Sequence, residues 1–399
     1  MRGPWAGPVA HARAAGVAGR GLELPFRHDD PVGVGCPGGA RREGPDGRRP
    51  ARHGPVGTDP GKGGTRLTAR RAADRVTAGP AYAPGSTMAR RSPTSPPHGF
   101  ALSAADDRLL RSAPPAETLR WVERVVGGGA RVRGVGALAG GTSSAVHAVT
   151  LDDGQGAVRE CVLRRFVRAD WQAEEPGLAQ REAAALAIAG RSNVPVPRLV
   201  AFDGDARETD VPAVLTTRLP GSVAWSAADL PTFLARLAEP LPSIHAVPVP
   251  AAAGIPDYRP YALDLQRPPR WATLPRVWER AIEAHAGPPP RAGHAFIHRD
   301  YHPGNVLWAD GAVAGVVDWV AASVGVPEAD VGHCRVNLYD RFGREAADAF
   351  LALYQAASGR SDYHPYWDIV AAIGGMDAAY EERPHPEDER FLAAAVARL

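Results

Sequence analysis

The chain has 399 residues, of which 44% are hydrophobic, and its formal net charge is only +2. That length and composition suffice for a full hydrophobic core and predict two lobes or domains. No run approaches the roughly 18 apolar residues of a membrane helix, no apolar run follows the N-terminal arginine as in a signal peptide, and the three cysteines are scattered without a C-x-x-C pair. These features argue against a membrane protein, a zinc site or a disulfide scaffold, and they favour a cytoplasmic protein.

The charge is unevenly distributed, because residues 1–95 hold 16 basic and 7 acidic side chains while the rest of the chain is net negative. This segment is crowded with Gly, Pro and Arg and has few large apolar residues, so we expect it to be disordered and to lie outside the fold. A basic tail of this kind favours contact with nucleic acid or an acidic membrane. The alternative, which we prefer, is a non-essential extension upstream of a start at Met88.

The next part of the chain has the pattern of helices followed by strands. Residues 104–127 have helical spacing interrupted by Pro114-Pro115, which predicts two helices. Strands are expected at 131–138 and 145–149, and the loop between them ends in Thr142, Ser143 and Ser144. Small residues bring backbone N–H groups and hydroxyls close to a phosphate, although an ordinary glycine-rich hairpin turn explains the same pattern.

A third strand at 161–166 carries Arg164 and Arg165, either of which offers a cation for phosphate. The chain's one lysine, Lys62, lies in the N-terminal segment, and arginine binds phosphate through two parallel hydrogen bonds. Glu182 falls in the middle of a helix predicted at 176–190, where it either pairs with Arg164 or is solvated. Two more strands, 199–202 and 213–217, precede Leu219-Pro220-Gly221, the expected boundary between a lobe at 96–219 and a lobe at 220–399.

The second lobe has a mainly helical pattern, with helices predicted at 230–245, 278–286, 344–358, 367–380 and 388–399. Its C-terminal part is acidic, with 13 acidic and 7 basic residues from Glu328 to Leu399. An acidic surface attracts a cationic acceptor. An ordinary solvated helical surface is the alternative, and we slightly prefer it.

The most informative segment of this lobe runs from His298 to Asn305 and has the sequence H-R-D-Y-H-P-G-N. Its first three letters and the position of its asparagine match the H-R-D-x-x-x-x-N pattern of phosphoryl-transfer sites. Apolar runs on both sides of Asp310-Gly311 predict a β-hairpin, with a register that places Asn305 opposite Asp318. In this interpretation Asp300 accepts a proton, while Asn305 and Asp318 bind Mg²⁺. Taken singly, a turn cap at Asp300 and a strand-end acid at Asp318 are simpler explanations.

Residues from about 130 to 358 resemble the aminoglycoside phosphotransferase family. The resemblance rests on Gly140 to Ser144, Val162 to Arg164, Arg181 to Leu186, Leu219 to Gly221, His298 to Trp308, Val317 to Trp319 and Pro327 to Gly332. It implies an α+β, bilobal, protein-kinase-like fold with a small β-rich lobe and a larger, mainly helical lobe. It also implies ATP or GTP in the interlobe cleft near Thr217 and Leu219, an Arg164–Glu182 pair, Asp300 as the base, and Mg²⁺ on Asn305 and Asp318. Arginine stands at 164, where many relatives have lysine.

Three functions remain open from the sequence. The first is an ATP-dependent kinase for a small-molecule hydroxyl, with an aminoglycoside, a similar antibiotic or another metabolite as acceptor. The second is a non-catalytic nucleotide-binding protein of the same fold, and the third is nucleic-acid binding through the basic tail, with steep salt dependence. Because Asp300, Asn305 and Asp318 are all present, we prefer the first and expect no membrane or nucleic-acid partner. No oligomeric state follows from the sequence.

Overall fold

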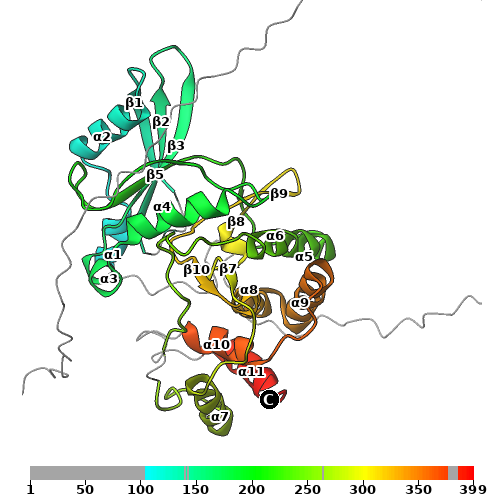
Figure 1. Ribbon diagram of the computed structural model, residues 1–399. Helices are drawn as coiled ribbons and strands as arrows, with labels where there is room; N and C mark the ends of the chain where they lie inside the picture. Colours follow the sequence, from blue (N-terminus) through cyan, green and yellow to red (C-terminus); the bar gives the residue numbers. More distant parts are fainter. Residues whose placement is uncertain (1–103, 139–140, 142, 263–264, 376–384) are drawn as a thin grey trace, which may run out of the picture. The chain divides into compact units, whose positions relative to one another are not determined.

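The computed structural model describes residues 104–138, 141, 143–262, 265–375 and 385–399. The expectation of disorder at 1–95 and the position of Thr142 lie outside these residues. In the described part, an antiparallel sheet precedes a mainly helical region (Figure 1), which confirms the α+β class. None of the helices described is long and apolar enough to cross a membrane.

The first region is built on a five-stranded antiparallel sheet with strand order β1-β2-β3-β5-β4. The strands are β1 (Arg131–Ala137), β2 (Ala145–Asp152), β3 (Val158–Arg165), β4 (Leu199–Asp203) and β5 (Ala213–Thr217), and the helices are α1 (Ala104–Leu110), α2 (Ala116–Val126), α3 (Ala169–Glu174) and α4 (Leu178–Ala189). Leu163 packs in one cluster with Trp121 and Val122 of α2. Val214 packs in another cluster with Leu186 of α4, so α2 and α4 cover opposite faces of the sheet.

The two arginines of β3 lie on opposite faces of the sheet, because successive side chains of a strand point to opposite faces. Arg164 lies on the α4 face and contacts Glu182. Arg165 lies on the other face, where it pairs with Asp210 and donates to the carbonyl of Ser112 at 3.1 Å. Of the two candidates, only Arg164 therefore faces the motif residues of the second region.

The second region holds short strands and most of the helices. Its elements are β6 (Ser222–Val223), α5 (Leu230–Ala238), α6 (Pro240–His245), α7 (Pro275–Ala286), β7 (Ala295–Ile297), the 3₁₀ turn η1 (Pro303–Asn305), β8 (Val306–Ala309), β9 (Ala312–Val316), β10 (Ser323–Gly325), α8 (Pro327–Phe342), α9 (Arg344–Ser358), α10 (Tyr366–Gly374) and α11 (Pro386–Val396). The helix predicted at 230–245 is two helices, because Pro240 opens a second one. Helix α10 ends at Gly374 rather than at 380.

Helix α8 is absent from the sequence prediction, yet it lies against the motif segment. Its start carries an ordinary signal: Pro327 is its first residue, and Glu328 and Asp330 lie in its first turn. Gly332 fixes its approach to α10, since a Cβ there would lie 2.4 Å from the carbonyl oxygen of Trp367. Only a residue without a side chain permits this packing.

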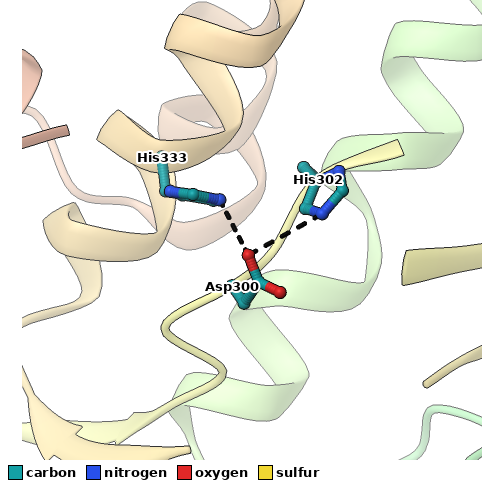
Figure 2. A group of neighbouring side chains, drawn as sticks. All are labelled: Asp300, His302 and His333. Atoms are coloured by element: carbon teal, nitrogen blue, oxygen red, sulfur yellow. Dashed lines mark ion pairs between the residues drawn. The ribbon is translucent and has the colours of Figure 1, made fainter. Parts of the chain in front are cut away.

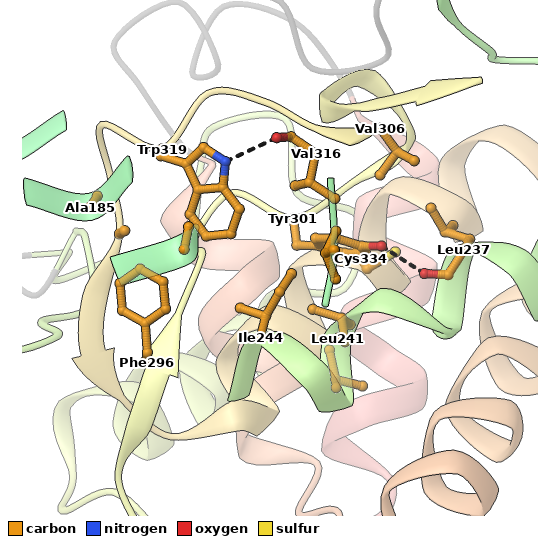
Figure 3. Packing of buried hydrophobic residues seen from close by; sticks show 14 of the residues in the cluster. Ala185, Leu237, Leu241, Ile244, Phe296, Tyr301, Val306, Val316, Trp319 and Cys334 are labelled. Atoms are coloured by element: carbon orange, nitrogen blue, oxygen red, sulfur yellow. Dashed lines mark hydrogen bonds between the residues drawn. The ribbon is translucent and has the colours of Figure 1, made fainter. Parts of the chain in front are cut away.

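Fully buried aromatic residues anchor both acidic motif residues to the core. Tyr301 follows Asp300, and its hydroxyl donates to the carbonyl of Leu237 at 2.8 Å. Trp319 follows Asp318, and its indole N–H donates to the carbonyl of Val316 at 2.9 Å. Figure 3 shows both rings in one apolar cluster with Phe296. Burying a side chain of this size stabilises by roughly 1.5–3 kcal/mol, so the neighbouring carboxylates have well-fixed backbones.

Glu389 of α11 serves as a cap for α7, although 115 positions separate it from Leu274, the residue that precedes this helix. Its carboxylate accepts the backbone N–H groups of Thr273 at 2.8 Å and Leu274 at 3.0 Å and the indole N–H of Trp278 at 2.9 Å. Burial raises the pKa of Glu389, but these hydrogen bonds and that of the Thr273 hydroxyl outweigh it, so the pKa lies below its ordinary value.

A carboxylate with a lowered folded-state pKa contributes stability above its unfolded pKa of about 4.3, and this contribution is lost as the pH falls through the folded value. We therefore expect Glu389→Gln to lower the free energy of unfolding by about 1–3 kcal/mol at pH 7 and by less below pH ~4. Urea denaturation at both pH values measures the difference. Glu387→Gln, at a half-buried position of the same helix where the partner is the exposed Arg390, is the control and should cost less than about 1 kcal/mol. An equal cost of Glu389→Gln at both pH values would refute the charge argument.

Candidate active site

Asp300 and Asn305 are in direct contact within the motif loop. The side-chain amide of Asn305 donates to a carboxylate oxygen of Asp300 at 2.9 Å and to its backbone carbonyl at 2.8 Å. Both N–H groups of that amide are therefore directed at Asp300, and the amide oxygen of Asn305 is left as an acceptor. Such an oxygen is a ligand that Mg²⁺ prefers.

The predicted hairpin exists, but its predicted register is wrong by one residue. β8 and β9 pair Val306 with Val316, and the register shifts between Leu307 and Trp308, where β9 has an extra residue. The backbone N–H of Val317, not of Asp318, then donates to the carbonyl of Asn305 at 2.9 Å. Asp318 follows with a left-handed φ of 67°. The predicted ladder would pair Ala309 with Ala314, whereas Ala309 pairs with Ala312 across the Asp310-Gly311 turn. The bulge makes up one of these two positions, which leaves Asn305 opposite Val317.

Arg164 joins the two regions of the protein at the site. Its guanidinium donates to the hydroxyl of Ser144 at 2.8 Å, to Glu182 at 2.9 Å and to Asp318 at 2.7 Å. The predicted Arg164–Glu182 pair is thus confirmed. The hydroxyl of Ser144 is buried against the arginine, so in this structure it orients Arg164.

The cluster of Arg164, Glu182 and Asp318 contains one positive and two negative side chains. Burial lowers the pKa of Arg164, but Asp318 and Glu182 more than reverse this and hold it above its ordinary value. Burial raises the pKa of Glu182, which Arg164 only partly offsets, and its second carboxylate oxygen has no hydrogen-bond partner among the described residues. A divalent cation between the free oxygens of Asn305 and Asp318 would supply the missing positive charge, so these residues fit Mg²⁺.

Asp300 faces two imidazoles in addition to Asn305. The Nε2 atoms of His333 and His302 lie 3.0 Å and 3.7 Å from one carboxylate oxygen of Asp300 (Figure 2). Burial raises the pKa of Asp300, but the charges of His302 and His333 and the hydrogen bond from His333 outweigh it and hold the pKa well below its ordinary value. Asp300 is therefore ionised at neutral pH, which is the form that accepts a proton.

Asp330 of α8 holds the motif loop in a strained conformation, a role the sequence analysis misses. Arg299 has a φ of 70°, which is costly for a residue with a side chain. The carboxylate of Asp330 accepts the backbone N–H of His298 at 2.8 Å and that of Arg299 at 2.6 Å, and it lies 3.0 Å from Nε2 of His245. These contacts offset the strain and fix the direction in which the side chain of Asp300 projects from the loop.

The remaining predicted residues lie on the segments around this cluster. Ser143 is half-buried beside Ser144. Thr217 ends β5, and its hydroxyl accepts the backbone N–H of Arg198 at 2.9 Å. Leu219 touches the hairpin, since a Cβ at Gly315 would lie 2.4 Å from its side chain. The nucleotide contacts assigned to these three residues remain predictions.

Comparison with known protein families identifies the class of this protein. Residues 134–371 match the family model described as the phosphotransferase enzyme family. The chain belongs to that family, which confirms the resemblance found in the sequence and makes the protein an enzyme of the phosphotransferase class. A search of curated proteins finds no match.

Solved structures of similar fold include several antibiotic phosphotransferases. A thermostable mutant of aminoglycoside phosphotransferase APH(4)-Ia, in a ternary complex with AMP-PNP and hygromycin B, is 16% identical with a TM-score of 0.50, covering 71% of this chain and 99% of that one. Macrolide 2'-phosphotransferase type I is 24% identical with a TM-score of 0.47, covering 75% and 98%. Macrolide 2'-phosphotransferase MphH from Brachybacterium faecium is 21% identical with a TM-score of 0.47, covering 70% and 97%. At 16% identity, the likeness to the aminoglycoside phosphotransferase structure supports the fold alone.

Proposed function

We propose that this protein transfers the γ-phosphoryl group of a nucleoside triphosphate, ATP or GTP, to a hydroxyl group of a small molecule in the cytoplasm. The observation that carries the proposal is the linked set of contacts from Glu182 through Arg164 to Asp318, beside the contact of Asn305 with Asp300. These contacts support the proposal, because they bring Arg164 as the proposed phosphate-binding cation together with the proposed oxygen ligands and base on adjoining segments. Phosphoryl transfer depends mainly on such positioning and charge neutralisation.

Each residue has a role that follows from its position. Asp300 accepts the proton of the acceptor hydroxyl as that oxygen bonds to the γ-phosphorus, and the bond from phosphorus to the nucleoside diphosphate breaks. Asn305 and Asp318 hold Mg²⁺, which neutralises charge on the phosphate oxygens. Arg164, oriented by Ser144 and Glu182, contacts the α- and β-phosphates. Ser143 approaches the phosphates, and the backbone from Thr217 to Leu219 contacts the base of the nucleotide.

The test is nucleotide consumption with a panel of acceptors that includes hygromycin B, other aminoglycosides, a macrolide and neutral sugars, followed by product mass measurement. The proposal predicts Mg-dependent consumption with at least one acceptor and a product heavier by one phosphoryl group. A thermal shift with Mg-ATP but no transfer to any acceptor would favour a non-catalytic nucleotide-binding protein instead.

We also expect that removal of residues 1–95 leaves phosphotransfer unchanged, because the residues that carry the proposed chemistry all lie beyond position 140. Transfer rates of the full chain and of the truncated chain, compared with one acceptor, measure this. DNA binding by the two proteins over a salt series is the parallel measurement. A loss of transfer on truncation would show that the basic segment belongs to the catalytic unit.

A further inference from the structure

Helix α8 contacts the motif loop at two points that are three residues apart in sequence. Asp330 binds the backbone of His298 and Arg299, and His333 reaches the side chain of Asp300 with its Nε2 atom 3.0 Å from the carboxylate. Residues at this spacing lie on the same face of a helix. Because Gly332 seats α8 closely against α10, His333 projects from a rigid support.

The carboxylate of Asp300 is held from both sides. One oxygen accepts from Asn305 at 2.9 Å, and the other faces His333 at 3.0 Å and, at the longer distance of 3.7 Å, His302. Two opposing donors fix both the position and the plane of a carboxylate. Since a carboxylate has about four acceptor sites, it can still accept the proton of an incoming hydroxyl.

Asp300, His302 and His333 could instead be a metal site, because one potential ligand atom from each lies within 4.8 Å of the others. The hydrogen bonding of His302 argues against it. Nδ1 of His302 accepts the backbone N–H of Gly304 at 3.1 Å, so the neutral ring carries its proton on Nε2, the atom that faces Asp300. A metal-bound histidine has the reverse arrangement, with a bare nitrogen on the metal and the other nitrogen donating. His333, at 3.0 Å, is within hydrogen-bond distance of the carboxylate, whereas His302, at 3.7 Å, is too far away to donate a hydrogen bond.

We propose that His333 is a positioning residue that holds the carboxylate of Asp300 toward the acceptor hydroxyl. This inference rests on the function proposed above, in which Asp300 is the base. A hydrogen bond that only orients the base alters the rate of transfer and leaves nucleotide binding unchanged. Misplacement of a reacting group by about 1 Å costs up to about 10²-fold in rate.

The experiment compares His333→Phe, which keeps a planar ring without the donor, with His333→Gln, whose amide N–H can reach the same carboxylate. The probes are the best acceptor of the panel and, independently, water as the acceptor for Mg-ATP. We expect His333→Phe to lower kcat by about 10- to 100-fold with KM for Mg-ATP unchanged, and His333→Gln to recover most of the loss. His294→Phe, on an exposed loop, is the control and should behave as wild type.

The double variant decides whether His333 acts through Asp300. In an Asp300→Ala background we expect His333→Phe to have no further effect on kcat, because coupled residues are not additive. A full additional loss there, or wild-type kcat in both single His333 variants, would overturn the inference. If Asp300→Ala itself turned over normally, the proposed base would be wrong. If His333→Phe turned over normally while Asp300→Ala did not, the proposed function would stand without the positioning role.

Metal binding is tested on the same proteins without nucleotide. The inference predicts no intense tetrahedral absorption band when Co²⁺ is added to wild type. A band that appears with wild type and disappears in His333→Phe would make the cluster a metal site and overturn the positioning role.

Discussion

Asp300→Ala should lower kcat for phosphotransfer by about 10²- to 10⁴-fold, the usual cost of deleting a general base. Binding of the nucleotide should be largely kept, because Asp300 does not contact Arg164, and Asn305 keeps its hydrogen bond to the backbone carbonyl of residue 300. Single-turnover transfer rates together with Mg-ATP affinity separate these two effects.

Two further variants help to interpret the loss of kcat in Asp300→Ala. Asp318→Ala should abolish Mg-dependent turnover and weaken Mg-nucleotide binding, because it removes a proposed metal ligand and leaves Arg164 paired with Glu182 alone. Asp310→Asn, in the exposed turn of the same hairpin, has a φ of 51° that asparagine tolerates and should leave activity unchanged. Normal turnover by Asp300→Ala would contradict the assigned base.

Asp368→Asn should lower the free energy of unfolding by about 3–5 kcal/mol, the cost of removing one partner of a buried ion pair. Asp368 of α10 is fully buried and accepts from Arg335 of α8 at 2.9 and 3.2 Å and from the hydroxyl of Tyr363 at 2.6 Å. Arg335 also donates to the carbonyl of Ala347 in α9 at 2.7 Å. The substitution leaves Arg335 buried with too little negative charge at the junction of three helices.

Urea denaturation measures the loss, and two variants test its cause. Asp348→Asn removes the half-exposed second partner of Arg335 and should cost less than about 1 kcal/mol. The double variant Arg335→Met with Asp368→Leu removes both buried charges and should recover much of the stability. If the double variant is as unstable as Asp368→Asn, the uncompensated charge is not the cause.

The sequence was sufficient where local patterns determine structure. The Asp310-Gly311 turn predicted the hairpin, and Pro114-Pro115 predicted the break between α1 and α2. The Arg164–Glu182 pair followed from a motif that links a strand to a helix. In each case the deciding residues are close together in the chain or belong to one recognisable pattern.

The sequence was insufficient where distant segments meet. The choice between Arg164 and Arg165 required knowing which face of β3 meets α4. The residue opposite Asn305 depended on the position of the turn and on the bulge between β8 and β9 together. Asp330 and His333 lie about 30 residues beyond the loop they contact. The start signal of α8 at Pro327 could have placed both on one helix face, but not against Asp300.

The central claim is that Asn305 and Asp318 together hold a divalent cation beside Arg164 and Asp300. A crystal structure with Mn²⁺ and AMP-PNP, with the ion located by its anomalous signal, tests this most directly. The claim predicts one peak at bonding distance from the amide oxygen of Asn305 and a carboxylate oxygen of Asp318, with phosphate next to Arg164. Mn²⁺ and nucleotide bound elsewhere, with these two side chains free of metal, would contradict it.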